Sequence, residues 1–223
     1  MAAPSYLRIV RHIESCLERH GDTPQGVDWP RPEDVDTRYA VMLDVIRSDH
    51  PGPVTLLDFG CGAGHLYEYL ARRRVGHVRY TGLDLSEKFV ALCRSKHPEV
   101  EFHCADILAG GVPEGLPRFD YVVANGVFTE KRELPFEEMR AYFEALVPRL
   151  FAMAGVGIAF NVMSKHVDWE RDDLFHLPLD VLAGFLTRHV TRHHVIRNDY
   201  GLYEYTVHAY REPRRWPGPS DPG

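Results

Sequence analysis

The sequence lacks several features that would place it in a common class of protein. No apolar run approaches the roughly 20 residues that a membrane-spanning helix needs, and residues 1–11 lack the long apolar core of a secretory signal peptide. No lysine- or arginine-rich block stands out and the net charge is -6, which argues against a nucleic-acid backbone as partner. We therefore expect a cytoplasmic protein without a nucleic-acid or membrane partner.

Cysteine is also scarce. The chain has four cysteines without paired spacing, which predicts reduced thiols rather than a disulfide framework. They are Cys16, Cys61, Cys93 and Cys104. His103, Cys104 and Asp106 form a short group of metal-ligand types, but their side chains alternate in direction along a predicted strand. Since no Cys-x-x-Cys pair accompanies them, we expect no metal site.

Length and composition are those of one globular domain. The chain has 223 residues, of which 44% are hydrophobic and 26% are charged, enough for a single α/β domain with a sizeable core. We expect residues 1–211 to form this domain, with a helical lid over residues 1–50 and the core over residues 51–211. Residues 212–223 hold four prolines and two glycines, which predicts a flexible tail.

The core is organised around residues 54–66. An apolar run from Val54 to Leu57 predicts a buried parallel strand, Asp58 follows it, and glycines occupy positions 60, 62 and 64 before a helical pattern begins at Leu66. A strand, a glycine-rich turn and a helix are the parts with which α/β proteins bind nucleotide-like ligands, because glycine lets the backbone approach the ligand. A dinucleotide fold would need its third glycine at position 65, which is His65. The acidic Asp58 instead suits a ligand with an ammonium or sulfonium group.

This stretch resembles motif I of the class I S-adenosylmethionine (SAM)-dependent methyltransferases, in which the acidic residue and the glycine loop bind the amino-acid part of the cofactor. The resemblance covers about residues 22–210 and is strongest over residues 54–128. Residues 199–207 also resemble the closing hairpin of bacterial small-molecule methyltransferases related to trans-aconitate methyltransferase. The resemblance implies SAM as the cofactor and S-adenosylhomocysteine (SAH) as its product.

Two further strand ends carry acidic residues. Asp84 follows a predicted strand over residues 78–83, at the position where a carboxylate binds a ribose diol, and Ser86 is available to cap the next helix. In class I methyltransferases an Asp after the third strand binds the adenine amino group and the next apolar residue packs on the ring; Asp106 and Ile107 match these positions. The predicted cofactor-binding residues are Arg38, Asp58, Gly60, Cys61, Gly62, Gly64, Asp84, Leu85, Asp106, Ile107, Asn125 and Gly126.

The rest of the pattern continues the alternation of strands and helices. We expect strands over residues 100–103, 119–124 and 156–161, helices over residues 66–74, 87–96, 136–151 and 179–187, and a hairpin of strands 193–198 and 202–210. Together with the resemblance, this predicts a Rossmann-like α/β fold: a class I methyltransferase sheet of parallel strands with a C-terminal antiparallel hairpin and helices on both faces. Helices over residues 5–20 and 33–48 would form the N-terminal lid.

The lid and the loops after the strands are expected to face the substrate. The predicted substrate contacts are Trp29, Phe128, His176 and Tyr200. The segment before residue 50 would either close over the ligand or cover an edge of the sheet. Arg38 would either reach the cofactor carboxylate or form a surface ion pair.

Methyl transfer to a small molecule is the predicted function. Oxygen is favoured over nitrogen as the acceptor because residues 125–128 lack the Asn-Pro-Pro-Tyr motif of amide and exocyclic-amine methyltransferases. His166 and Glu130 are the predicted catalytic residues, as proton acceptors. Three alternatives remain. The chain would be an accessory protein that binds SAM without catalysis, an oxidoreductase with a dinucleotide, or an aminopropyl transferase, which needs a more acidic site than residues 130–133 provide.

Overall fold

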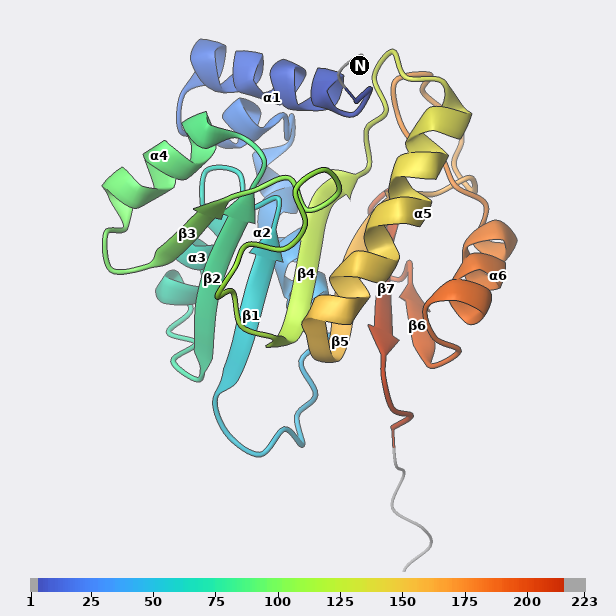
Figure 1. Ribbon diagram of the computed structural model, residues 1–223. Helices are drawn as coiled ribbons and strands as arrows, with labels where there is room; N and C mark the ends of the chain where they lie inside the picture. The colour runs from blue at the N-terminus through green and yellow to red at the C-terminus, as the bar shows by residue number, and fades with distance from the viewer. Residues whose placement is uncertain (1–3, 215–223) are drawn as a thin grey trace, which may run out of the picture.

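The computed structural model describes residues 4–214, and a seven-stranded sheet forms its centre (Figure 1). The strand order is β3-β2-β1-β4-β5-β7-β6. The strands are β1 (Val54–Phe59), β2 (Val78–Asp84), β3 (Glu101–Cys104), β4 (Phe119–Phe128), β5 (Ala154–Met163), β6 (His194–Arg197) and β7 (Glu204–Tyr210). The first five pair in parallel, and β7 runs antiparallel to both β5 and β6. The predicted parallel sheet with a C-terminal antiparallel hairpin is confirmed.

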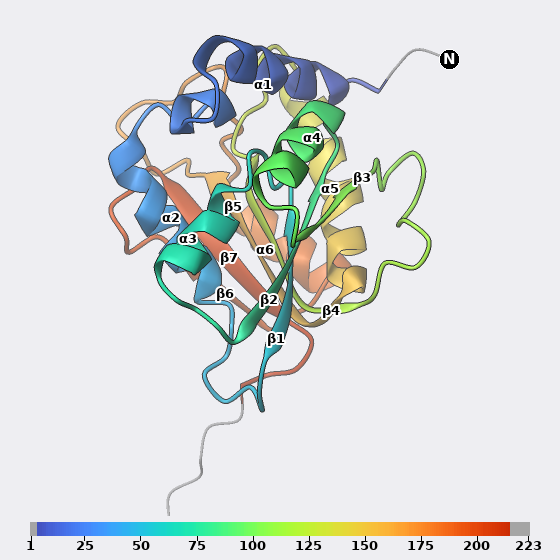
Figure 2. The same cartoon turned by 90° about the vertical axis from the view of Figure 1, so that its left-hand side faces the viewer.

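Helices cover both faces of this sheet, as predicted (Figure 2). One face carries α5 (Phe136–Met153), whose apolar side packs on β4 and β5, and α6 (Leu179–His189), whose Phe185 ring contacts Phe143 of α5. The other face carries α2 (Val35–Leu43) and α3 (His65–Arg72), while α4 (Glu87–Lys96) packs beside β2 and β3. Burial on both faces explains why the central strand β1 is buried at every position except Thr55, rather than at alternate positions.

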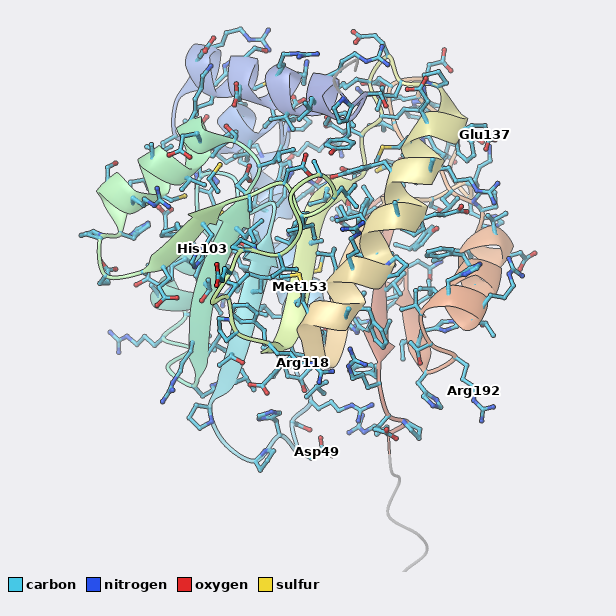
Figure 3. All side chains as sticks on the ribbon, viewed as in Figure 1. Asp49, His103, Arg118, Glu137, Met153 and Arg192 are labelled. Carbon is cyan, nitrogen blue, oxygen red and sulfur yellow. The ribbon has the colours of Figure 1, made fainter. Side chains whose placement is uncertain are left out.

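The chain reverses its strand order on either side of β1, because β2 and β4 both pair with this strand. Ligands of open α/β sheets bind outside the carboxyl ends of the strands at such a switch point. Helix α1 (Leu7–His20) crosses the molecule at this end of the sheet (Figures 1 and 2). Asp49 and Arg118 lie at the opposite end (Figure 3).

The segment that covers the strand ends is shorter than the lid expected over residues 1–50. It consists of α1 and two short 3-10 helices, η1 (Pro24–Val27) and η2 (Pro32–Asp34). Helix α2 belongs instead to the core, because its Tyr39, Val41 and Met42 are buried. We therefore call residues 4–34 the N-terminal cover.

Other boundaries also differ from the prediction. Helix α2 ends at Leu43, although a helix is expected up to residue 48, and β4 continues to Phe128 beyond the expected end at residue 124. The predicted flexible tail over residues 212–223 lies mostly outside the described residues. Within residues 4–214, none of the helices combines the length and the apolarity that crossing a membrane requires.

Candidate active site

A cavity of about 170 Å³ lies between the N-terminal cover and the carboxyl ends of β1, β2 and β4. The cover supplies an apolar wall from Ile9, Val10 and Ile13 of α1. The predicted cofactor residues that line the cavity are Asp58, Gly60, Cys61, Gly62, Asp84, Leu85, Asp106, Ile107, Asn125 and Gly126.

The glycine loop after β1 depends on its glycines at two positions. Gly60 has φ +73°, and a Cβ atom there would lie 2.6 Å from Val127 Cγ2. Gly62 has φ +51°, and its N–H donates a hydrogen bond of 2.9 Å to Asp84 Oδ2. Both residues adopt a left-handed conformation that other residues rarely take. The loop is thereby tied to the end of β2, and its backbone forms the floor of the cavity.

Asp58 lies at the end of β1 and is almost fully buried. The Tyr80 hydroxyl donates a 2.7 Å hydrogen bond to Asp58 Oδ2. Burial raises the pKa of Asp58 to about 7, and the nearby Asp84 carboxylate acts in the same direction, while the hydrogen bond from Tyr80 opposes it. A buried carboxyl in this state gains most from a cationic ligand, which fits the ammonium group of SAM.

Asp84 holds the turn that follows β2. One carboxylate oxygen accepts the Gly62 N–H and the other accepts the Ser86 N–H at 2.8 Å. Burial raises the pKa of Asp84, and these backbone hydrogen bonds oppose the increase. Each oxygen retains a second lone pair, so the same carboxylate has the capacity to accept hydrogen bonds from a ribose diol.

Asp106 is held in the same way after β3. Its Oδ1 accepts the N–H groups of Leu108 and Ala109 at 3.0 and 3.1 Å, and its Oδ2 accepts the Tyr6 hydroxyl at 2.7 Å. Tyr6 stacks on Tyr142, with ring centroids 4.9 Å apart. Both tyrosines line the cavity. Sequence reasoning missed them, because their contacts join segments about one hundred residues apart.

The opposite end of the cavity is formed by the end of β4 and by Trp29 of the cover. Gly126 has φ +82°, and a Cβ atom there would lie 3.2 Å from the indole Nε1 of Trp29. Asn125 is 9% exposed, and Thr129 and Glu130 continue the wall. Trp29 therefore stands against the segment after the predicted fourth strand, which is expected to face the substrate.

Glu130 is the ionisable side chain of this end. Burial raises the pKa of its carboxyl to about 8, and the Asp173 carboxylate adds to the shift. Arg132 Nη2 lies 2.7 Å from Glu130 Oε2 but also contacts Asp28 and Asp173. Because one guanidinium is shared among three carboxylates, it does not fully neutralise Glu130.

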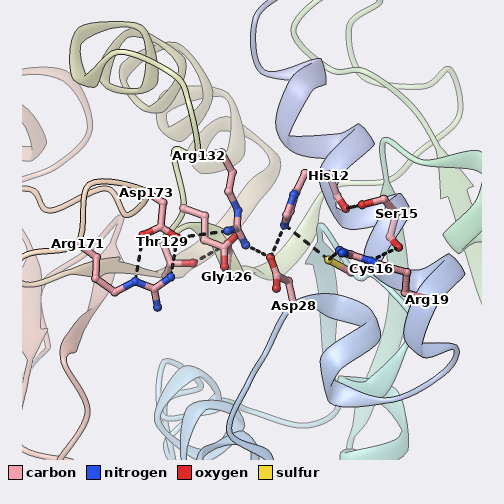
Figure 4. Close-up of polar contacts among 11 residues, drawn as sticks. His12, Ser15, Cys16, Arg19, Asp28, Gly126, Thr129, Arg132, Arg171 and Asp173 are labelled. Atoms are coloured by element: carbon pink, nitrogen blue, oxygen red, sulfur yellow. Dashed lines mark hydrogen bonds and ion pairs between the residues drawn. The ribbon is translucent and has the colours of Figure 1, made fainter.

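Arg132 also ties the cover to the body of the protein (Figure 4). Asp28 of the cover contacts Arg132, and His12 of α1 lies 2.7 Å from the same carboxylate oxygen. Asp173, on the loop after β5, completes the group. We call Arg132, Asp28 and Asp173 the latch. Three segments distant in sequence thus meet at one guanidinium.

The latch also bears on metal binding. The ligand atoms of His12, Cys16 and Asp28 lie within 4.8 Å of one another. However, Arg132 contacts Asp28, and Arg19 Nη2 lies 3.2 Å from Cys16 Sγ. Two guanidinium groups therefore already supply the positive charge that a metal ion would bring to this group.

Two predicted substrate contacts occupy other places in the fold. The prediction that Phe128 contacts the substrate is wrong. Strand β4 continues through an irregularity after Ala124 and buries this ring completely against Phe143 and Phe160. Tyr200 does not line the cavity; its hydroxyl lies 2.9 Å from Thr206 Oγ1 at the hairpin.

The two predicted histidines belong to the loop after β5. His166 is exposed and does not line the cavity, which corrects its placement as a proton acceptor. His176 is buried, its Nε2 accepts the Arg171 N–H at 3.2 Å, and its Nδ1 lies 2.6 Å from the Ser164 carbonyl oxygen. Since Nε2 accepts, Nδ1 must carry the proton and donate it. His176 therefore stabilises the conformation of its own loop instead of facing the substrate.

Two predicted cofactor residues also have structural roles. Arg38 Nη2 pairs with Glu204 Oε2 at 3.0 Å, and its guanidinium lies 5.1 Å from the Trp29 ring. Arg38 was expected either to reach the cofactor carboxylate or to form a surface ion pair, and this pairing with a buried glutamate is neither. Gly64 has φ +79° at the start of α3, and a Cβ atom there would lie 3.2 Å from Cys93 Sγ. Gly64 thus allows α4 to pack closely behind the glycine loop.

Comparisons with known proteins agree with this geometry. A family model described as a methyltransferase domain matches residues 56–148. A protein of Mycobacterium tuberculosis (strain ATCC 25618 / H37Rv) that carries the name of a methyltransferase is 31% identical over 160 residues, which cover 70% of this chain and 92% of that protein. The trans-aconitate 2-methyltransferase of Variovorax paradoxus (strain S110) is 32% identical over 163 residues, covering 71% of this chain and 57% of that enzyme.

Among solved structures, the fold matches that of magnesium protoporphyrin IX methyltransferase from Synechocystis PCC 6803 with bound SAM. The TM-score is 0.63 at 17% sequence identity, and the match covers 95% of this chain and 99% of that chain. The chain therefore belongs to the methyltransferase family with the class I fold. It is a SAM-dependent methyltransferase that acts on a small molecule. Its curated relatives include both an O-methyltransferase and an N,N-dimethyltransferase by name.

Proposed function

We propose that the protein transfers the methyl group of SAM to an oxygen atom of a small molecule, and that Glu130 takes the proton from that oxygen. SAM supplies a methyl group already activated by the sulfonium charge, so the chain contributes positioning and a site closed to water. The observation that carries the proposal is the buried Glu130 carboxyl in the wall of the cavity, beside the end of β4.

One end of the cavity suits the cofactor and the other end suits the acceptor. Asp58 suits the ammonium group of the cofactor, Asp84 a ribose diol and Asp106 an adenine amino group. Trp29 and Glu130 then flank the space that remains beyond Asn125 and Gly126. This arrangement supports an acceptor site at the end of the cavity formed by Trp29 and the end of β4.

Glu130 suits the role of a base because of its environment. A general base works best when its pKa lies close to the working pH, and such a group typically contributes 10²- to 10⁴-fold to the rate. Burial raises the pKa of Glu130 to about 8, which is near neutral pH and far above that of an exposed glutamate. No other carboxyl among the described lining residues stands at this end of the cavity.

The first experiment is a calorimetric titration of the protein with SAH, with NADH as the control. We expect micromolar binding of SAH and none of NADH. Methyl transfer is then measured with SAM labelled in its methyl group and a panel of phenols, aliphatic alcohols, carboxylic acids and amines. Label in an oxygen-methylated product supports the proposal. Binding of SAH without transfer to any member of the panel favours the accessory role instead.

The base is tested with Glu130→Gln, and Glu133→Gln is the matched control because Glu133 is an exposed carboxyl on the same loop. We expect Glu130→Gln to lower turnover at least 100-fold while SAH affinity changes less than threefold. Glu133→Gln should leave both unchanged. Full turnover by Glu130→Gln would remove this residue from the reaction.

A further inference from the structure

A buried chain of polar side chains runs behind the acceptor end of the cavity. Asn161 on β5 is 1% exposed, and its Nδ2 donates to Asn125 Oδ1 at 3.1 Å and to Glu204 Oε1 at 2.9 Å. The second oxygen of Glu204 pairs with Arg38 at 3.0 Å. Four elements, α2, β4, β5 and β7, thus contribute to one network. Its last member, Asn125, lines the cavity.

This network determines which way the Asn125 amide points. The Gly126 N–H is a donor, and it donates to Asn161 Oδ1 at 2.7 Å. The other half of the Asn161 amide must therefore be its NH2 group, which donates to Asn125 Oδ1. It follows that the Asn125 NH2 group points away from Asn161. Asn125 Nδ2 has no hydrogen-bond partner within the described residues.

A donor at this position distinguishes oxygen from nitrogen acceptors. A hydroxyl oxygen has two lone pairs, so it can attack the methyl carbon with one and accept a hydrogen bond from Asn125 with the other. A neutral amine has one lone pair, which the attack consumes. An ammonium group has none. The Asn125 NH2 group therefore stays unpaired when nitrogen is the acceptor, which is unfavourable for a buried donor.

The charge of the side chains that line the cavity further restricts the chemical class of the acceptor. Of the described residues that line the cavity, four are carboxylates (Asp58, Asp84, Asp106 and Glu130) and none is lysine or arginine. The nearest guanidinium groups are engaged, that of Arg38 by Glu204 and that of Arg132 by the latch. A polycarboxylate would enter this cavity without a cationic partner, and desolvating its charges would be costly.

We infer that the acceptor is an uncharged hydroxyl compound, whose oxygen accepts a hydrogen bond from Asn125 Nδ2, and that Asn161 and Glu204 position this donor. The inference rests on the proposed methyl transfer to oxygen. The oxygen forms a bond to the methyl carbon while the carbon–sulfur bond breaks, with its electron pair left on sulfur. The hydroxyl proton passes to the Glu130 carboxylate, so atoms and charge balance.

The chain offers a direct probe of this hydrogen bond, because it contains only three asparagines, Asn125, Asn161 and Asn198. Protein labelled with ¹⁵N at asparagine gives three pairs of side-chain NH2 signals, one pair for each residue, and the variants Asn125→Asp and Asn198→Asp assign them. The labelled protein is first saturated with SAH. It is then titrated with 4-methylphenol, 4-methylbenzylamine and tricarballylate, which represent a phenol, an amine and a polycarboxylate.

We expect 4-methylphenol to bind at least tenfold more tightly than the other two probes and to shift the Asn125 signal. Three results would overturn the inference: tighter binding of the amine or of tricarballylate, no binding of the phenol, or an Asn125 signal that SAH alone shifts and the phenol leaves in place. The last result would make Asn125 a cofactor contact. Failure of SAH itself to bind would instead overturn the proposed function.

Asn125→Asp provides a second, independent measurement. The carboxylate keeps an oxygen for Asn161 Nδ2 but presents an acceptor where the wild type presents a donor. We expect the preference to shift toward 4-methylbenzylamine by at least tenfold, with SAH affinity within threefold of wild type. Asn198→Asp, on an exposed loop, controls for the added charge and should keep the wild-type preference. An unchanged preference in Asn125→Asp would contradict the inference.

Discussion

The hydroxyl of Tyr6 donates a 2.7 Å hydrogen bond to Asp106 Oδ2, across one hundred residues of sequence. Asp106 is the residue predicted to bind the adenine amino group. The N-terminal cover therefore occupies part of the hydrogen-bonding capacity of Asp106. Burial and this hydrogen bond raise the pKa of Tyr6 to about 12, so the phenol remains a donor throughout the physiological range.

This contact predicts opposite effects for two substitutions of Tyr6. Tyr6→Phe keeps the ring stacked on Tyr142 and frees Asp106 Oδ2, so we expect SAH to bind up to about fivefold more tightly, in line with one hydrogen bond of roughly 1 kcal/mol. Tyr6→Ala also removes the ring that covers the site, so SAH should bind more weakly than to wild type. Calorimetry measures both. Weaker binding by Tyr6→Phe would show that the hydroxyl helps to hold the cofactor.

The protonation of Asp58 predicts that cofactor binding depends on pH. Its pKa is raised from 3.8 to about 7, so below pH 7 the carboxyl carries a proton that the cationic amino group must displace. SAH affinity should therefore rise with pH, by up to about tenfold per unit below pH 7, and level off above it. Calorimetry in buffers of different ionisation enthalpy should show release of about one proton at pH 6.

Asp58→Asn tests the origin of this dependence. The amide cannot neutralise an ammonium group, so we expect SAH to bind about 10- to 100-fold more weakly and the pH dependence below pH 7 to disappear. Asp49→Asn is the matched control, since Asp49 is exposed at the end of the molecule opposite the cavity (Figure 3). A pH dependence that survives in Asp58→Asn would assign it to another group.

The sequence predicted the cofactor end of the site much better than the acceptor end. Asp58, Asp84 and Asp106 follow successive parallel strands, and parallel strands bring their carboxyl ends to one edge of the sheet. Local pattern and topology therefore suffice to place them. Asn125 and Gly126 follow from the same rule, because β4 is the next neighbour of β1.

The residues that sequence reasoning misplaced or missed depend on contacts that no local pattern encodes. Phe128 is buried because β4 continues beyond the glycine after Asn125. Both ring nitrogens of His176 form hydrogen bonds with backbone groups of its own loop, and no sequence pattern marks these groups. Tyr6 and Arg132 act through partners in distant segments. Such side chains are identified only once the fold brings the segments together.

Burial of Glu130 has a consequence for stability as well as for catalysis. Its pKa lies at about 8 in the folded protein against 4.5 for an ordinary glutamate, so between these values the folded state binds more protons than the unfolded state. Stability must then fall as pH rises through this range, by at most about 1.4 kcal/mol per pH unit from this residue. The contribution is intact below pH 4.5 and lost above pH 8.

Glu130→Gln removes this titration. We expect the free energy of unfolding of the variant to decline less between pH 5 and pH 8 than that of wild type, while Glu133→Gln declines as wild type does. Urea unfolding at several pH values measures the difference. Equal slopes for Glu130→Gln and wild type would show that Glu130 ionises normally in the folded protein.

The latch predicts unequal effects for substitution of Arg132 and of Arg171, which pairs with Asp173 from outside the latch. Arg132 is 17% exposed at its side chain and contacts the carboxylates of Asp28, Asp173 and the buried Glu130, so Arg132→Gln removes the cation that these three groups share. We expect a loss of stability of about 2–4 kcal/mol and faster dissociation of SAH, because Asp28 no longer holds the cover.

Arg171 contacts Asp173 from a side chain that is 54% exposed, so Arg171→Gln should cost less than about 1 kcal/mol. Stopped-flow release of SAH and urea unfolding measure both effects. If the two variants released SAH equally fast, the contact between Arg132 and Asp28 would not be what keeps the cover closed.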